Sequence, residues 1–311
     1  MKIVALAGGV GGAKLADGLS RCLPDNDLTI IVNTGDDFVH WGLKICPDLD
    51  TVCYTLAGLA NPETGWGRNE ESWQVFENMR SLGCEEWFRI GDKDIATHIE
   101  RTRRLNAGQT LSEVVHDFSR AWNIGPKIIP ATNQPLATIV NTVEKGELAF
   151  QEYFVHQRCE PVVEGFRFQG IETALPAPGV LEAIHQADSI IICPSNPWVS
   201  IDPIINIPGI SDALHKKQVI AVSPIIAGQT IKGPAAKMFA ELGIQPSAMA
   251  VARHYEKILT GFVLDVIDSQ QFSEILDFSI HPLITNTLMK TTRDRQQLAQ
   301  DVLHFIERLT S

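Results

Sequence analysis

The chain has 311 residues, of which 44% are hydrophobic and 20% are charged, and this composition excludes disordered, fibrous and low-complexity proteins. Its formal net charge of −11 repels nucleic acid and anionic lipid, so an anionic ligand must be held by a local group of donors. The apolar runs are far shorter than the ~20 residues of a membrane-spanning helix. The N-terminus has no signal-peptide pattern, and the six cysteines have no metal-binding spacing. We therefore expect a cytoplasmic protein that binds neither nucleic acid nor membrane.

The N-terminal segment predicts a strand, a glycine-rich loop, a helix and a second strand. The apolar runs Lys2–Ala7 and Leu28–Asn33 are the strands, Gly8–Gly12 is the loop, and Ala13–Cys22 is an amphipathic helix. Both strands are apolar on both faces, which is typical of a parallel sheet covered by helices on each side.

The middle of the chain has a different pattern, which we interpret as a helical and β-hairpin insertion over approximately residues 65–175. The predicted helices are Glu71–Leu82, Ile95–Leu105 and Leu111–Trp122, and the predicted hairpin pairs Leu136–Val143 with Glu147–Val155.

Alternation of helices and buried strands returns in the second half of the chain. The predicted elements are helix Val180–Ala187, strand Ser189–Cys193, helix Ile210–Lys216, strand Gln218–Val222, strand Gly261–Ile267 and the closing helix Arg293–Leu309. The whole pattern predicts one Rossmann-like α/β domain over residues 1–311, with a doubly wound, mostly parallel sheet.

The segment Leu6–Lys14 lies where the first strand meets the first helix. Free amides and glycines at such a corner suit phosphate, which makes Gly9, Gly11, Gly12 and Lys14 candidate ligands of a nucleotide. The segment lacks the Gly-Lys-Ser/Thr of a Walker A loop and the third glycine of a dinucleotide fingerprint, which argues against ordinary ATPase and NAD chemistry. A tight turn that needs glycine only for its geometry is the alternative.

Two carboxylates, Asp48 and Asp50, follow the second strand. On an extended segment, side chains two residues apart point the same way, so this pair can share a Mg²⁺ ion. Alternatively, Asp50 caps a helix over Thr51–Ala57.

A third segment, Gly91–Arg104, begins with Lys93 between two acids and ends with three arginines. Lys93 is well placed for binding, but acids in the first turn and arginines in the last turn also complement the dipole of a helix. His98 is a candidate base or a structural histidine.

The predicted strand ends at residues 193 and 222 are followed by loops that contain Ser195, Asn196 and Ser223. Ligands of open α/β sheets bind outside the carboxyl ends of the strands, so these side chains are candidates for hydrogen bonds to a nucleotide. The alternative is that these residues only shape the loops and bind no ligand.

Seven motifs in order along the chain resemble those of one family, the CofD family of 2-phospho-L-lactate transferases of coenzyme F-420 biosynthesis. They are GGVGGAK at Gly8–Lys14, NTGDDF at Asn33–Phe38, PDLDT at Pro47–Thr51, GDKDIATHI at Gly91–Ile99, PSNP at Pro194–Pro197, VSPI at Val222–Ile225 and GPAAKM at Gly233–Met238.

The resemblance implies a Mg²⁺-dependent transferase that moves a phospholactyl or phosphoenolpyruvyl group from a guanosine diphospho-ester to the deazaflavin FO and releases GMP. It implies that the Gly8–Lys14 loop and the strand-end loops hold the guanosine diphosphate and that a homodimer is possible. It also implies that Asp50 and Lys93 contact FO, with Asp50 catalytic, either by orienting the hydroxyl or by sharing a metal with Asp48. The chain departs from the family pattern at Cys46, at Asn133-Gln134 and at Asn286. The alternative is a nucleotide-sugar-binding regulatory protein, because a related group of proteins shares the glycine loop without this reaction.

Overall fold

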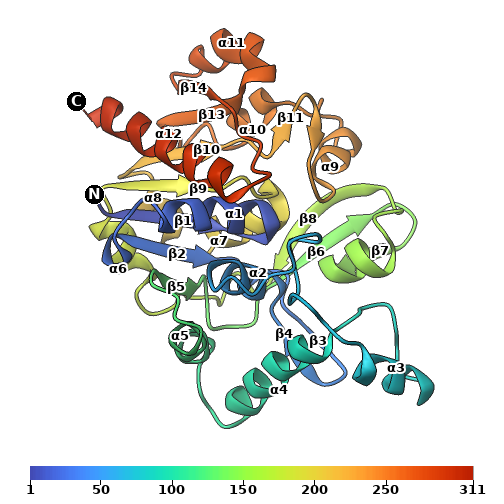
Figure 1. The fold of residues 1–311 in the computed structure, drawn as a ribbon. Coiled ribbons are helices and arrows are strands. Elements are labelled where there is room, and N and C mark those ends of the chain that lie inside the picture. The colour runs from blue at the N-terminus through green and yellow to red at the C-terminus, as the bar shows by residue number, and fades with distance from the viewer. Residues whose placement is uncertain (311) are drawn as a thin grey trace.

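Seven parallel strands form the central sheet of the computed structural model, which describes residues 1–310 (Figure 1). In spatial order they are β14 (His281–Thr285), β13 (Gly261–Asp265), β10 (Gln218–Val222), β9 (Ser189–Ile192), β1 (Ile3–Ala7), β2 (Leu28–Val32) and β5 (Lys127–Pro130). The chain winds outward from β1 on one side and returns to continue from β9 on the other. The predicted doubly wound α/β fold is confirmed, and its topological switch point lies between β1 and β9.

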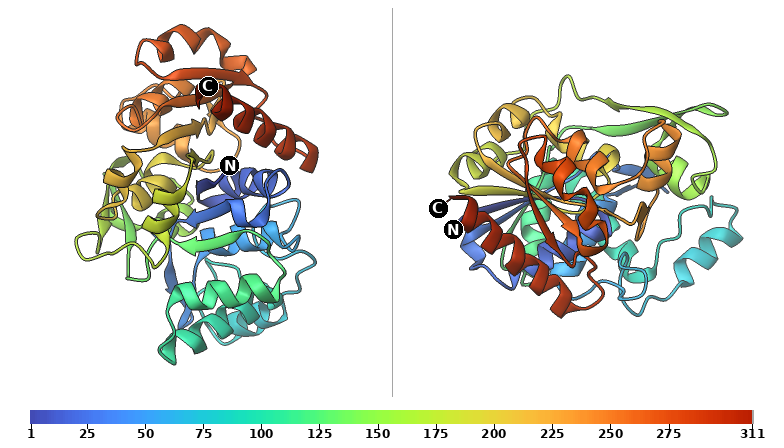
Figure 2. Two further views of the ribbon diagram at one scale, coloured as in Figure 1. Left: turned by 90° about the vertical axis from the view of Figure 1, so that its left-hand side faces the viewer. Right: turned by 90° about the horizontal axis from the view of Figure 1, so that it is seen from above.

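Helices cover both faces of this sheet. Two of them, α1 (Gly9–Ser20) and α12 (Thr292–Thr310), pack on each other against one face, and α6 (Val180–Gln186) and α8 (Ile210–Leu214) lie against the other (Figure 2). Alternate residues of β1 enter the two cores: Ile3 belongs to the first and Leu6 to the second. Each such buried side chain contributes roughly 1.5–3 kcal/mol to folding, which explains the uninterrupted apolar runs of these strands.

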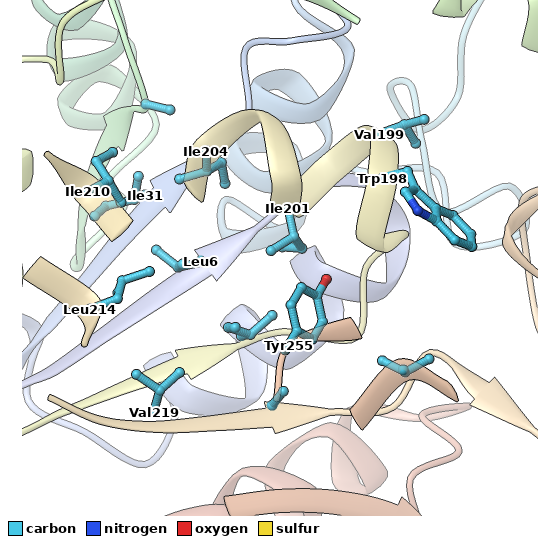
Figure 3. Close-up of a cluster of buried hydrophobic side chains, with 14 of the residues drawn as sticks. Leu6, Ile31, Trp198, Val199, Ile201, Ile204, Ile210, Leu214, Val219 and Tyr255 are labelled. Atoms are coloured by element: carbon cyan, nitrogen blue, oxygen red, sulfur yellow. The ribbon is translucent and has the colours of Figure 1, made fainter. Parts of the chain in front are cut away.

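The second core reaches from the sheet to the loops above its carboxyl edge. Figure 3 shows Leu6 and Val219 of the sheet facing Ile201, Leu214 and Tyr255. These residues join β1, β10, α8, the π-helical turn η3 (Pro197–Ile201) and the end of α10 (Ala248–His254) into one packed unit. The loop after β9 is thereby held rigidly beside the glycine-rich corner.

The middle of the chain carries two small antiparallel sheets and three helices. The elements are β3 (Phe38–His40), β4 (Leu43–Ile45), α3 (Gln74–Ser81), α4 (Asp92–Asn106), α5 (Leu111–Ala121), β6 (Ala137–Thr142), β7 (Gly146–Ala149) and β8 (Val163–Gln169). Figures 1 and 2 show α3 and α4 at one end of the molecule and β14 at the other.

The structure corrects four sequence predictions. The strand expected over Glu147–Val155 ends at Ala149, and a π-helical turn, η2 (Glu152–His156), follows it. Because β5 belongs to the central sheet, residues 65–175 are not one continuous insertion. Helix α1 begins at Gly9 instead of Ala13, so the glycines form its first turn. Helix α2 (Pro47–Leu56) begins earlier than expected, with a proline in its first position.

The remaining elements are short. They are η1 (Asp25–Asp27), α7 (Asp202–Ile205), β11 (Ile225–Ile226), β12 (Gln229–Thr230), α9 (Ala235–Glu241), η4 (Val266–Gln271) and α11 (Phe272–Leu276). Across residues 1–310, none of the helices combines the length and the apolar character that crossing a membrane requires.

Candidate functional site

The glycine-rich corner lies at the topological switch point, where the loop after β9 packs directly on the first turn of α1. A Cβ at Gly11 would collide with the carbonyl oxygen of Pro194, and one at Gly12 would lie 2.6 Å from Ser195 Oγ. Gly9 has a positive φ of 60°, which favours glycine. These glycines are therefore required by close approach as well as by the turn.

Asp48 closes this corner from the side of α2. Its Oδ1 accepts a hydrogen bond of 2.6 Å from the amide of Gly9, and a Cβ at Gly8 would collide with its Oδ2. A carboxylate therefore lies at the amide that a phosphate oxygen would use at the N-terminus of α1.

The three predicted hydrogen-bonding side chains of the strand-end loops all have partners inside the protein. Ser195 Oγ accepts from the amide of Gly8 at 3.2 Å and donates to its carbonyl at 2.8 Å. Asn196 Oδ1 caps η3 through the amide of Trp198 at 3.1 Å. Ser223 Oγ donates to the carbonyl of Ile225 at 2.8 Å. These contacts shape the loops, and direct contact of these side chains with a ligand stays a prediction.

Two lysines beside the corner are held only by main-chain carbonyls. Lys14 Nζ donates to the carbonyl of Met289 at 2.9 Å, and Lys232 Nζ donates to the carbonyls of Glu63 and Thr64. Burial lowers the pKa of Lys14, and the nearby charges of Arg295 and Lys232 lower it further. In the described chain, neither lysine has a carboxylate partner, so both carry uncompensated positive charge to the corner.

The prediction that Asp48 and Asp50 share a metal ion assumed that they lie on an extended segment, and this assumption is wrong. Both residues lie in the first turn of α2, where side chains two apart do not face each other. Asp48 contacts Gly9 and Asn33, and Asp50 pairs with Arg101 of α4. The helix-cap alternative for Asp50 is also wrong, because the N-cap position belongs to Cys46.

A different pair of carboxylates, Asp36 and Asp48, meets at one amide group. Asn33 Nδ2 lies 3.3 Å from Asp36 Oδ1 and 3.0 Å from Asp48 Oδ2. Burial raises the pKa of Asp48 to about 7, although its hydrogen bonds from Asn33 and Gly9 lower it. Burial and then the charge of Asp48 raise the pKa of Asp36. Two buried carboxylates so close together form an oxygen-rich site that suits Mg²⁺.

A second cluster, formed by Asp50, Asp94 and His98, also has ligand atoms close enough for a metal ion, all within 4.8 Å of one another. However, the guanidinium of Arg101 lies in this cluster: it pairs with Asp50, and its Nη1 lies 3.2 Å from His98 Nδ1. Because guanidinium only donates, His98 Nδ1 accepts and the neutral ring carries its proton on Nε2. A fixed positive charge at this place disfavours a metal ion.

Lys93 lies on the first turn of α4, and its side chain is about half exposed. Its Nζ donates to the carbonyl of Asn69 at 2.9 Å. The next residue, Asp94, accepts a hydrogen bond of 2.7 Å from Tyr54 OH of α2. This hydrogen bond links α2 to α4, the helices that carry Asp50 and Lys93, although no direct contact joins these two residues.

Sequence reasoning missed an open cavity of about 610 Å³ beside this region, lined by Glu85, Glu86, Trp87, Arg89, Val155, His156 and Arg158. The rings of Trp87 and His156 are stacked with their centres 5.4 Å apart. Trp87 also packs against Phe38, 5.7 Å between ring centres, and Phe38 directly follows the acidic pair Asp36-Asp37. The aromatic residues around 84–89 were the available signal, but their partner His156 is distant in sequence.

The positions that depart from the family pattern have local roles. Cys46 Sγ is buried and lies 3.1 Å from Asp37 Oδ2. Asn133 Oδ1 accepts from the amide of Ser112 at 2.9 Å, and Asn286 Oδ1 accepts from that of Leu288 at 3.1 Å. All three contacts lie within the protein.

Comparison with known proteins agrees with this architecture. The structure resembles the crystal structure of a member of the UPF0052 family from Bacillus halodurans with a TM-score of 0.62 and 14% sequence identity, over 97% of this chain and 98% of that one. This likeness supports the fold alone.

Relatives that are closer in sequence carry names of enzymes. The chain is 41% identical over 314 residues to the phosphoenolpyruvate transferase of Streptomyces griseus, covering 99% of both chains. It is 38% identical over 301 residues to the 2-phospho-L-lactate transferase of Methanosarcina mazei, covering 97% of this chain and 99% of that one. A family model described as 2-phospho-L-lactate transferase CofD matches residues 3–303. The chain therefore belongs to the CofD family and is a transferase.

Proposed function

We propose that this enzyme transfers a phospholactyl or phosphoenolpyruvyl group from a guanosine diphospho-ester to the deazaflavin FO and releases GMP, as a step of coenzyme F-420 biosynthesis. The observation that carries the proposal is the juxtaposition at the carboxyl edge of the sheet. The first turn of α1 and two lysines without a carboxylate partner lie together there, and α2 carries both Asp48, which contacts Gly9, and Asp50. The names of the two relatives support both possible transferred groups, phosphoenolpyruvyl and phospholactyl.

In the proposed reaction a hydroxyl of the ribityl chain of FO attacks the phosphorus that carries the acid. The new phosphorus–oxygen bond forms as the bond to the GMP oxygen breaks, and the hydroxyl proton is released to solvent. Transfer of this kind gains mainly from positioning and from neutralisation of charge. The amides of Gly11 and Gly12 and the ammonium groups of Lys14 and Lys232 would hold the diphosphate, and the amide of Gly9 would join them where a phosphate oxygen replaces Asp48. Asp50 would orient the attacking hydroxyl, and Lys93 would contact FO.

Mg²⁺ belongs to this proposal because a diphosphate normally binds with a divalent cation. The metal would neutralise charge on the transferred phosphoryl group and the leaving group. Of the two residues predicted from sequence, Asp48 fits this role, and Asp36 is its better partner because Asp50 is neutralised by Arg101. A homodimer stays a prediction.

The proposal is tested by incubating the protein with FO, Mg²⁺ and either guanosine diphospho-ester, followed by chromatography. We expect equal amounts of GMP and of a negatively charged deazaflavin product, with one donor preferred. Absence of both products with either donor would refute the proposal. Tight binding of a UDP-sugar without any turnover would instead favour the regulatory alternative.

A further inference from the structure

Arg101 differs from the other arginines of its helix. Arg103 and Arg104 lie at or near the surface, where they pair with Glu100, and Arg104 also pairs with Asp117. The side chain of Arg101 is only 2% exposed, although it sits in the same run of basic residues. Exposed arginines that complement the helix dipole therefore describe Arg103 and Arg104 but not Arg101.

The guanidinium of Arg101 ties three elements together. Its Nη2 pairs with Oδ1 of Asp50 on α2, and its Nη1 donates to the carbonyl of Lys44 on β4 at 3.2 Å. The same Nη1 lies 3.2 Å from Nδ1 of His98, one turn earlier on α4. A planar group with donors in a fixed fork holds its partner in one orientation. The direction of the Asp50 carboxylate is thus set by α4 and β4.

The other oxygen of Asp50 has no hydrogen-bond partner among residues 1–310. Oδ2 is buried, and Nδ1 of His98, which lies 3.7 Å away, already accepts from Arg101. Buried polar atoms nearly always have a partner. An unpartnered carboxylate oxygen beside an ordered ion pair therefore points to a donor that the ligand supplies.

Burial raises the pKa of Asp50, whereas the charge of the adjacent Arg101 guanidinium lowers it. The acids around the cluster, Asp94 and Asp37, are themselves held by Tyr54 and Lys44. Arg101 is consequently the cation that compensates Asp50, which leaves one carboxylate oxygen as a fixed acceptor.

From this geometry we infer that Arg101 is a positioning residue: it holds Asp50 so that its free Oδ2 accepts a hydrogen bond from the hydroxyl of the acceptor substrate. This inference rests on the proposed function, because it takes FO as the donor of that hydrogen bond. In this inference the guanidinium of Arg101 occupies the cluster of Asp50, Asp94 and His98, whose ligand atoms are otherwise close enough together to bind a metal ion.

The test is a double-mutant cycle with Arg101→Met, Asp50→Asn and the double variant, with Arg103→Met as the matched control on the same helix. We expect Arg101→Met to reduce kcat by about 30-fold or more, with KM for the guanosine diphospho-ester changed by less than about 3-fold. Arg101→Lys should restore part of this loss, because it returns the charge but not the fork. In the Asp50→Asn background the Arg101→Met substitution should cause no further loss, since the two residues act as a unit. Arg103→Met should leave kcat unchanged.

Two results would overturn the inference: a folded Arg101→Met variant with kcat within about 2-fold of the wild type, or an equal loss in the presence and absence of Asp50. If Arg101→Met does not fold, the double variant is compared with Asp50→Asn alone. The double variant contains neither charged side chain, so it leaves no unpaired charge buried. A difference in kcat between these two variants contradicts the inference.

Failure of the proposed function is recognised separately, because the wild type would then release no GMP. The same cycle is therefore also measured by calorimetric binding of FO. The inference is supported if each single substitution and the double variant weaken FO binding to the same extent. Unchanged FO affinity in all three variants contradicts it.

Discussion

The glycine corner and the Asp50 cluster face opposite sides of the proposed reaction, and they are built in different ways. The corner is made of main chain: its residues are contiguous over Gly8–Lys14, and its tight contacts with Pro194 exclude larger side chains. The Asp50 cluster is made of isolated side chains from α2 and α4 with one main-chain carbonyl of β4, and its main contact joins residues 51 positions apart in the chain. We expect the first kind of site to be more sensitive to changes of shape than of charge, and the second to be sensitive to both.

The strongest test of this contrast is Asp50→Asn. We expect turnover to fall by about 10²–10⁴-fold, which is typical of the loss of an acid–base or orienting carboxylate. The sequence alone predicts little loss of stability. The structure predicts a loss of up to ~3–5 kcal/mol, because Arg101 would be left as a buried charge without its partner. Steady-state GMP release and chemical denaturation measure the two effects. Full activity would remove Asp50 from the site.

Gly11→Ala tests the shape requirement of the corner. The added methyl group would collide with the carbonyl of Pro194, so we expect α1 to shift and GDP to bind at least about 10-fold more weakly, with a loss of ~1–3 kcal/mol in stability. Gly165→Ala is the control, since its nearest contact would be 3.9 Å away. Equal GDP affinity in both variants, measured by calorimetry, would show that the corner does not hold the nucleotide.

Lys232→Ala tests the charge at the corner. Lys232 approaches from the loop after β12 and lies near Lys14, so its loss should weaken GDP binding by about 3–10-fold and reduce the dependence of affinity on salt. Lys216, an exposed lysine at the end of α8, supplies the control Lys216→Ala. An identical effect of the two substitutions would mean that only net charge matters.

The smallest expected effect is a dependence of stability on pH in metal-free buffer. Burial raises the pKa of Asp48 to about 7, so the folded state binds more protons than the unfolded state between the ordinary aspartate pKa and about pH 7. Stability should therefore fall as pH rises through this window and level off above it. Asp48→Asn should flatten the curve of melting temperature against pH. An unchanged curve would mean that Asp48 ionises normally.

Much of the central sheet could be predicted because its strands are buried on both faces and read as uninterrupted apolar runs. Two strands escaped detection: β5 ends at Pro130, and β14 begins with His281 and Pro282. Both are edge strands, where proline is tolerated and burial is incomplete. Apolar pattern carries little information about such edges.

The site was predictable to the extent that it is local. The glycine corner was identified from adjacent residues, and its place at the switch point followed from the fold. Asp48 and Asp50 were singled out from the sequence, but it did not show that both lie in the first turn of a helix and face different partners. The burial of Arg101 had no local signal, because its helix reads as exposed and basic at that end. Only the packing of α4 on α2 and β4 distinguishes it from Arg103.

The most direct test is a crystal structure of the protein with GDP and FO bound. It should show the diphosphate at the amides of Gly9–Gly12 with Lys14 beside it, and a ribityl hydroxyl of FO within hydrogen-bond distance of Asp50 Oδ2. A nucleotide lodged away from the first turn of α1, or FO bound out of reach of Asp50, would contradict the account.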